Sequence, residues 1–242
     1  MRLCRSDYSY AIEREQFERH ADLFVEMRKG KTASLWPEVT FDDGHLSNFE
    51  YALPVLQSRG LTARFFITAG WTGMKPGYMG WPELRSLHAA GQLIGAHGWS
   101  HTLLTHCAGK ELDKELSGAR LLLEDKLGAA ITTMSLPGGR YNQRVLAACR
   151  EAGYSRVYTS EPSAEPVPAG YRVGRLNIRG DMTLEWIRSV LQPGSRVLSG
   201  LERQYRVKAA AKRMLGDRLY ETFWAVFNRK EPDPEDGEKG AE

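Results

Sequence analysis

The sequence has few cysteines and no long apolar run. Its three cysteines, Cys4, Cys107 and Cys149, are far apart and odd in number, which argues against a disulfide framework and is compatible with a reducing compartment. No apolar segment approaches the roughly 18 residues that a membrane-spanning helix needs, and the first residues lack the apolar core of a secretory signal. The sequence therefore predicts a cytoplasmic chain.

An excess of charge of one sign is also absent. The 33 basic and 30 acidic residues give a formal net charge of +3, which is too small to indicate a nucleic-acid partner. Hydrophobic residues make up 42% of the 242 residues, enough for a sizeable core in one large α/β domain. We therefore expect a globular protein that does not bind nucleic acid.

Strand and helix patterns alternate along most of the chain. Short apolar runs end at polar residues or glycine, and stretches with helical spacing lie between them. The expected strands are 36–41, 63–68, 92–96, 131–136, 154–159 and 171–178, and the expected helices are 48–56, 81–90, 110–127, 145–152 and 183–191. This rhythm predicts a parallel sheet of about seven βα units, too many for a flavodoxin-like sheet and short of an eight-unit barrel.

The two ends of the chain differ from this central region. Residues 1–35 are expected to be an N-terminal helical extension, residues 36–195 the barrel domain, residues 196–229 a basic amphipathic helix and residues 230–242 a disordered tail. A basic, aromatic helix of this kind either packs on its own domain or lies on a membrane surface. Peripheral membrane contact is therefore one of two interpretations of the C-terminal helix.

Two adjacent carboxylates follow the first expected strand. Asp42 and Asp43 stand between Phe41 and Gly44, where the backbone can turn sharply. Such close like charges repel, so one carboxyl would be protonated unless a cation lies nearby. Alone, the Asp-Asp-Gly triplet is also compatible with a surface turn. A metal ion is the simplest cation to expect here.

Two histidines supply further ligands. His97 and His101 follow the strand 92–96 and are four residues apart, a spacing that places both imidazoles on one face of a helical turn. One carboxylate and two imidazoles form a three-ligand metal site with open positions, which is the catalytic kind. A solvated helical turn without metal is the simpler alternative for the histidines alone.

These two motifs together resemble those of the polysaccharide deacetylases, carbohydrate esterase family four with the NodB homology domain. The resemblance rests on Thr40-Phe41-Asp42-Asp43-Gly44 and His97-Gly98-Trp99-Ser100-His101, and it extends from about Val39 to about Ile187. It implies a distorted, incomplete (β/α) barrel. It also implies that Asp42 is the catalytic base and that Asp43, His97 and His101 bind a divalent metal, with Zn2+ favoured over Co2+ or Mn2+.

The chain departs from the family pattern in three places. Where the family has an Arg-x-Pro motif, this sequence has Ser135-Leu136-Pro137, so Arg140 or Arg175 is the candidate for the missing positive charge. Gly98 replaces the usual Ser or Thr after the first ligand histidine. The family's late histidine, its general acid, has no counterpart after His106. His45 is the candidate substitute, with an ordinary turn residue as the alternative.

Substrate contacts are expected at the strand ends. Pro137, Gly138 and Tyr141 follow the fourth expected strand, and backbone N–H groups near Tyr141 are candidates to hold an oxyanion. Trp71 lies in a loop rich in glycine and aromatic residues. It is a candidate sugar-stacking residue, with packing as the simpler interpretation.

The resemblance implies a hydrolase acting on carbon–nitrogen bonds other than peptide bonds. Its expected substrate is an acetylated sugar or glycan, from which it removes an N-acetyl or, less readily, an O-acetyl group. Two alternatives stay open: a deacylase of a small non-glycan amide, and a catalytically impaired glycan-binding protein that keeps the metal. The sequence does not predict the oligomeric state.

Overall fold

The computed structural model describes residues 10–29, 37–163 and 170–215. The chain divides into two compact units, Met1–Ser199 and Gly200–Glu242. Helix α9 (Arg196–Leu215) covers part of the expected basic helix, whose remainder lies with the expected disordered tail outside the described residues. Within the described ranges, no helix combines the length and apolarity needed to cross a bilayer.

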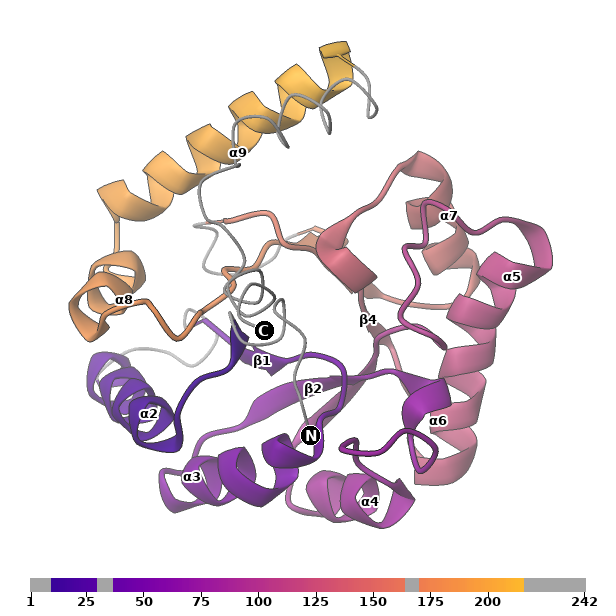
Figure 1. Ribbon diagram of the computed structural model, residues 1–242, viewed down its shortest axis with the longest axis horizontal. Coiled ribbons are helices and arrows are strands. Elements are labelled where there is room, and N and C mark those ends of the chain that lie inside the picture. The colour runs from indigo at the N-terminus through magenta and orange to yellow at the C-terminus, as the bar shows by residue number, and fades with distance from the viewer. Residues whose placement is uncertain (1–9, 30–36, 164–169, 216–242) are drawn as a thin grey trace, which may run out of the picture. The chain divides into compact units, whose positions relative to one another are not determined.

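The sheet contains six parallel strands in sequence order. They are β1 (Val39–Phe41), β2 (Ala63–Ile67), β3 (Leu93–Ala96), β4 (Thr133–Ser135), β5 (Arg156–Tyr158) and β6 (Arg172–Val173). Every neighbouring pair is parallel, and the order never reverses as it does in a doubly wound sheet. With helices around its outside (Figure 1), this sheet is an incomplete (β/α) barrel, as predicted.

Helices lie between successive strands from β1 to β5, and α8 follows the last strand. They are α3 (Leu53–Ser58), α4 (Trp81–Ala89), α5 (Gly109–Asp113), α6 (Ala119–Leu127), α7 (Gln143–Glu151) and α8 (Leu184–Leu191). Two helices that the sequence predicts as continuous contain a π-helical turn, at Asn48–Ala52 before α3 and at Lys114–Gly118 between α5 and α6. Such turns are rare and concentrate at functional sites. The second of them contacts the main chain of Trp99 and Ser100, just after β3.

The core lies on both faces of the sheet. In β2, Phe65, Phe66 and Ile67 are all buried although they alternate in direction, as expected for a parallel strand covered on both sides. Leu84 of α4 and Leu123 of α6 are fully buried against this sheet region. Burial of these side chains stabilises the strands whose ends carry the polar residues described below.

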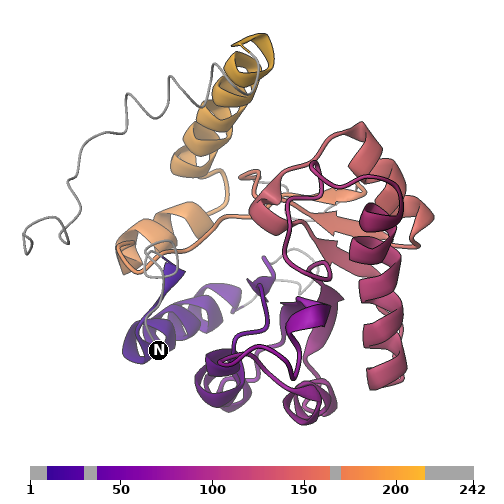
Figure 2. The same cartoon turned by 45° about the vertical axis from the view of Figure 1, so that its right-hand side comes forward.

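Helix α2 (Arg14–Arg28) lies at the open edge of the sheet. The ring of Phe17 meets the ring of Phe41 on β1 edge-on, with centroids 5.7 Å apart. At its other end, Glu26 forms an ion pair with Arg188 of α8 at 2.9 Å. Figures 1 and 2 both show α2 beside α8. The N-terminal helix thus contacts both the first strand and the last barrel helix.

The last strand is shorter than predicted. The sequence predicts a strand over 171–178, whereas β6 contains only Arg172 and Val173. Arg175 therefore lies beyond the strand and not on it. The side chain of Arg175 donates hydrogen bonds to the main-chain oxygen of Thr159 and to the hydroxyl of Thr40. Just after β6, therefore, the side chain of Arg175 points toward the ends of the neighbouring strands.

Candidate active site

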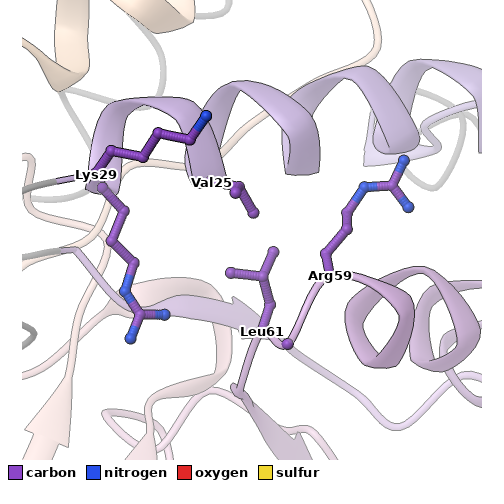
Figure 3. A pocket seen from close by; sticks show the side chains of 6 residues that line it. Val25, Lys29, Arg59 and Leu61 are labelled. Atoms are coloured by element: carbon purple, nitrogen blue, oxygen red, sulfur yellow. The ribbon is translucent and has the colours of Figure 1, made fainter.

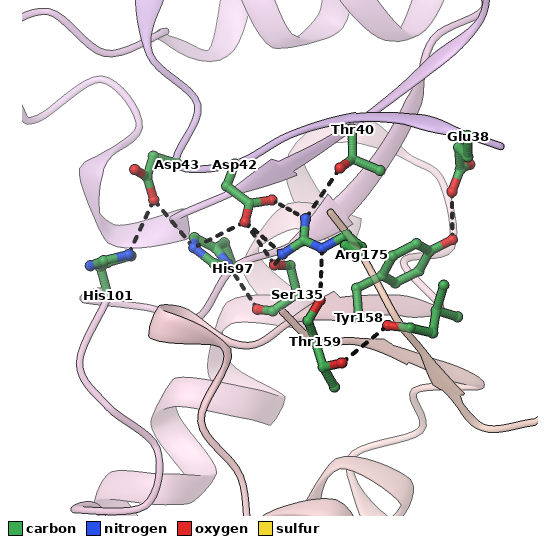
Figure 4. Close-up of polar contacts among 11 residues, drawn as sticks. Glu38, Thr40, Asp42, Asp43, His97, His101, Ser135, Tyr158, Thr159 and Arg175 are labelled. Atoms are coloured by element: carbon green, nitrogen blue, oxygen red, sulfur yellow. Dashed lines mark hydrogen bonds and ion pairs between the residues drawn. The ribbon is translucent and has the colours of Figure 1, made fainter. Parts of the chain in front are cut away.

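The candidate site forms where the carboxyl ends of the strands meet. Asp42 and Asp43 directly follow β1, His97 directly follows β3, and Ser135 is the last residue of β4. In a (β/α) barrel this edge carries the catalytic residues. Figure 4 shows these side chains converging, with Asp43 between His97 and His101, and with Asp42 between His97 and Arg175.

Asp43, His97 and His101 form a group that could hold a metal ion. Their ligand atoms all lie within 4.8 Å of one another. Oδ1 of Asp43 lies 3.2 Å from Nε2 of His97 and 3.3 Å from Nε2 of His101. This oxygen is buried and has no ordinary hydrogen-bond partner among the described residues. A divalent cation fits such a set of converging lone pairs.

The tautomer of His97 supports the same conclusion. Nδ1 of His97 lies 2.8 Å from the main-chain oxygen of Ser135, and a carbonyl only accepts, so Nδ1 carries the hydrogen. In the neutral ring, the lone pair is then on Nε2, which faces Asp43. Burial lowers the pKa of His97, but the carboxylates of Asp42 and Asp43 outweigh that effect and raise it. The two carboxylates therefore favour a positive charge at this position. In metal sites, a ligand histidine is commonly oriented by a hydrogen bond from its other ring nitrogen to a carbonyl, like that from Nδ1 of His97 to Ser135.

The pKa values of Asp43 and His101, the neighbours of His97, are both lowered. Burial raises the pKa of the Asp43 carboxyl, but interaction with His97 and His101 outweighs burial and lowers it. Burial lowers the pKa of His101, and the neighbouring His97 lowers it further. An ionised carboxylate and a neutral imidazole are the forms that bind metal.

The backbone is unusual at two of these three residues. Among the described residues, those other than glycine with positive φ are Asp43, at 72°, and His101, at 64°. This conformation costs of order 1–3 kcal/mol and persists where the surroundings enforce it. The predicted helical turn at 97–101 is wrong. The segment is a loop with Gly98 at φ 78°, and loop geometry rather than helical spacing brings the imidazoles together.

Arg175 binds Asp42 through a guanidinium group whose N–H donors all have acceptors. Nη1 donates to Oδ1 of Asp42 at 2.7 Å and Nη2 donates to Oδ2 at 2.8 Å. The other donors reach Thr40 Oγ1 at 3.3 Å, Ser135 Oγ at 2.7 Å and the Thr159 carbonyl at 3.2 Å. All five N–H donors of the guanidinium group are thus satisfied. Arg175 fixes Asp42 relative to three strand ends.

Asp42 is held ionised next to the metal group. Burial raises the pKa of its carboxyl, but the charge of Arg175, the charge of His97 and hydrogen bonds to the carboxyl outweigh burial and lower the pKa to about 2. Oδ2 of Asp42 lies 3.9 Å from Nε2 of His97. The side chain is 31% exposed, so a molecule entering from solvent can reach it.

Ser135 takes part in the site although the sequence interpretation gave it no role. Its hydroxyl donates to Oδ2 of Asp42 at 3.0 Å and accepts from Arg175, while its carbonyl accepts from His97. It occupies the place where the family resemblance implies an arginine. That position was the signal that could have identified it. Arg140, the other candidate arginine, is exposed just after the turn Pro137–Gly139.

The expected substrate residues lie in two separate clusters. The Trp71 ring lies beside His101, with centroids 5.3 Å apart, and also contacts Tyr78 at 4.8 Å. Nζ of Lys75 lies 3.3 Å from the centroid of Trp71, so an ammonium group already occupies part of the ring's surface. Trp71 therefore lies next to the candidate metal ligand His101 and packs against Tyr78 and Lys75.

The second cluster contains Tyr141. Its hydroxyl donates to Oε1 of Glu161 at 2.5 Å and accepts from Arg172. Pro137 is buried, and Gly138 is exposed within the turn that follows β4. These residues lie at the carboxyl edge of the sheet, on the neighbouring strand ends β4 to β6.

His45 lies near the Trp71 cluster. The main-chain N–H of Ser47 donates to its Nδ1 at 3.2 Å, so Nε2 carries the hydrogen in the neutral ring. Its backbone pairs with Tyr78, and the two rings meet edge-on with centroids 5.5 Å apart. Since Tyr78 contacts Trp71, aromatic contacts link His45 to the neighbour of His101.

A hollow elsewhere on the barrel does not compete with this site. Figure 3 shows Val25, Lys29, Arg59 and Leu61 lining it between α2 and the turn before β2. It lies at the amino ends of the strands, opposite the catalytic edge. Arg59 is already paired there with Asp22 at 2.7 Å. The hollow therefore offers no group suited to the chemistry of the carboxyl edge.

The sequence was compared with models of known protein families. The family model for polysaccharide deacetylase matches residues 29–157, more than half of the 242 residues. The chain belongs to the polysaccharide deacetylase family. The matched region contains Asp42, Asp43, His97 and His101, and it ends before Arg175. The resemblance inferred from the two motifs is thereby confirmed.

Two curated relatives illustrate the match. YxkH of Bacillus subtilis is 28% identical over 146 residues, which cover 60% of this chain and 52% of that protein. Chitin deacetylase 1 of Cryptococcus neoformans is 26% identical over 119 residues, covering 49% of this chain and 24% of that protein. The chain therefore spans about half or less of the length of these polysaccharide deacetylase relatives.

Solved structures agree on the fold. The deacetylase PplD of Streptococcus pyogenes, in complex with acetate, superposes with a TM-score of 0.68 at 16% identity and covers 80% of this chain and 94% of its own. IcaB from Ammonifex degensii gives 0.65 at 21% identity, with 84% and 93% covered. These similarities confirm the incomplete barrel of the polysaccharide deacetylases.

Proposed function

We propose that this polysaccharide deacetylase family member hydrolyses the N-acetyl group of an acetylated sugar or glycan with the help of one divalent metal ion. The observation that carries the proposal is that an ionised carboxylate lies next to a group of potential metal ligands. Asp42 is held ionised by Arg175, and Asp43, His97 and His101 converge beside it. Asp42 would accept a proton, and the other three residues would bind the metal ion. Metal-assisted amide hydrolysis needs both functions.

Zinc is the ion that we favour. Two imidazoles and one carboxylate suit Zn2+, although Co2+ and Mn2+ accept the same donors. When bound, such an ion would polarise the acetyl carbonyl and lower the pKa of water towards neutrality. His97 would bind through Nε2, since its Nδ1 donates to Ser135, and Asp43 through the otherwise unpartnered Oδ1.

Asp42 would accept the proton of the attacking water. Three of the roughly four lone-pair positions of its carboxylate accept hydrogen bonds, two from Arg175 and one from Ser135. About one position is left for a proton from water. Because these bonds prevent rotation of the carboxylate, Asp42 is oriented before the substrate arrives, which removes an entropic cost from the reaction.

Arg175 would act as a positioning residue for Asp42. Replacing it with Lys keeps the positive charge but loses the fork that binds both carboxylate oxygens. We expect R175K to lower kcat by about 10²-fold, since small displacements of a catalytic group cost this much. The matched control is R59K, because Arg59 also donates to both carboxylate oxygens of an aspartate, Asp22, but at the opposite edge of the sheet. A kcat of R175K that equals those of R59K and the wild type would contradict the positioning role.

His45 would serve as the proton donor to the departing amine. As an imidazolium it would donate from Nδ1 to the hydroxyl of Ser47, 2.8 Å away, which leaves the Nε2 proton for the amine. Its ring lies in the aromatic cluster beside His101. General acids contribute about 10²–10⁴-fold, so we expect H45Q to lose kcat within that range on an amide substrate. An activated ester, whose leaving group needs no proton, should be spared. The control is H88Q on the exposed face of α4. Equal losses on amide and ester would exclude His45 as the acid.

The substrate class is tested by acetate release. We would compare N-acetylglucosamine oligomers with small acetylated amides that contain no sugar, at equal enzyme and zinc concentrations. The proposal predicts faster release from the oligomers. Release from the small amides alone would support the non-glycan deacylase. Zinc binding and oligomer binding without release would support the impaired, glycan-binding alternative.

A further inference from the structure

The loop that carries His101 surrounds a buried carboxylate. Glu115 lies in the π-helical turn Lys114–Gly118 and is only 3% exposed. It falls on the buried side of the helix with Leu112, Leu116 and Ala119, where a charged residue is unusual. A buried carboxylate needs hydrogen-bond donors or a cation, so its partners indicate its role.

The donors to Glu115 come from the segment between the two ligand histidines. Oε2 accepts from the main-chain N–H of Trp99 at 2.8 Å and from that of Ser100 at 3.1 Å. Oε1 accepts from the hydroxyl of Ser100 at 2.6 Å. Three hydrogen bonds from two consecutive residues hold the loop Gly98–His101 around one side chain. Glu115 thus accepts these bonds from within the π-helical turn.

The same arrangement explains Gly98. A Cβ atom at this residue would lie 2.9 Å from Oε2 of Glu115 and 3.6 Å from Cγ of Pro137. Its φ of 78° is also in the region that favours glycine. The Ser or Thr implied by the family pattern would therefore collide with the carboxylate. Gly98 and Glu115 are complementary, and the departure noted in the sequence has a structural cause.

We propose that Glu115 is a positioning residue that sets the conformation of the loop Gly98–His101 and, through it, the place of His101 in the metal group. The role of Glu115 in the loop conformation does not rest on the proposed function, whereas the effect on metal affinity does. His101 has positive φ, which the loop must enforce. Loss of the residues that orient a metal ligand typically costs about 10–100-fold in metal affinity.

The experiment compares E115A with E124A. Glu124 is the matched control, because its Oε1 also accepts from a loop main-chain N–H, that of Ile131 at 2.9 Å, but away from the site. In the metal-free proteins, amide hydrogen exchange at Trp99 and Ser100 should accelerate at least tenfold in E115A and stay unchanged in E124A. Zinc affinity, measured by competition with a chromophoric chelator, should fall about 10–100-fold in E115A only.

The outcomes separate this inference from the proposed function. Unchanged exchange at Trp99 and Ser100 in folded E115A would overturn the role of Glu115. If E115A does not fold, E115D decides, because its side chain keeps the carboxylate but is one methylene too short to reach the N–H groups of Trp99 and Ser100 in the same way. Faster exchange at those amides in E115D supports the role, and unchanged exchange overturns it. A wild-type chain that binds no zinc would defeat the proposed function, while amide exchange would still decide the role of Glu115.

Discussion

Asp42→Asn should lower deacetylation by about 10²–10⁴-fold, the usual contribution of a general base. The amide cannot accept the proton of water at this position, and its NH2 group would face a donor of Arg175. Zinc affinity should stay near that of the wild type, because Asp43, His97 and His101 are unchanged. Acetate release and zinc titration on the same protein preparation measure the two effects separately.

The control for Asp42→Asn is Asp181→Asn. Asp181 is also paired with an arginine, Arg179, at 3.2 Å, but its side chain is 70% exposed. We expect no change in acetate release from this variant. Activity of Asp42→Asn within tenfold of the wild type, with the fold intact by circular dichroism, would exclude Asp42 as the base.

The double variant His97→Ala/His101→Ala should lose the metal and all turnover. It removes two of the three ligands, so its loss of affinity should exceed the roughly 10–100-fold expected when only an orienting partner is lost. Elemental analysis should show about one zinc per chain in the wild type and almost none in the variant. Acetate release should fall to background in parallel.

His106→Ala is the control for the ligand variant. His106 is an exposed histidine five residues after His101, and it should keep both zinc and activity. Zinc retained at full occupancy by His97→Ala/His101→Ala would show that the metal binds elsewhere. In that case the convergence on Oδ1 of Asp43 would need another explanation.

The sequence predicted the barrel because its signals were local and repeated. Buried strand runs, amphipathic helices and strand-end motifs recur in order, and the six strands lie where they were expected, with shorter boundaries. The Asp-Asp and His-x-x-x-His motifs identified the carboxyl edge of the sheet. Their joint occurrence was informative because parallel strands bring distant motifs to one edge.

The sequence could not predict how the site is held. The 97–101 segment has helical spacing, yet Gly98 and His101 have positive φ. Its residues Trp99 and Ser100 donate hydrogen bonds to the carboxylate of Glu115, which lies outside the local pattern. Similarly, the choice between Arg140 and Arg175 depends on where β6 ends. The structure places Arg175 on Asp42, a contact across 133 positions that no local pattern encodes.

Metal-dependent deacetylation is tested most directly by acetate release from the same protein with and without its metal. The wild-type chain would be stripped with a chelator and then titrated with Zn2+ in the presence of an N-acetylglucosamine oligomer. We expect no release after stripping and full recovery that saturates at one zinc per chain. Release that continues unchanged in the stripped protein, or zinc binding that restores none, would contradict it.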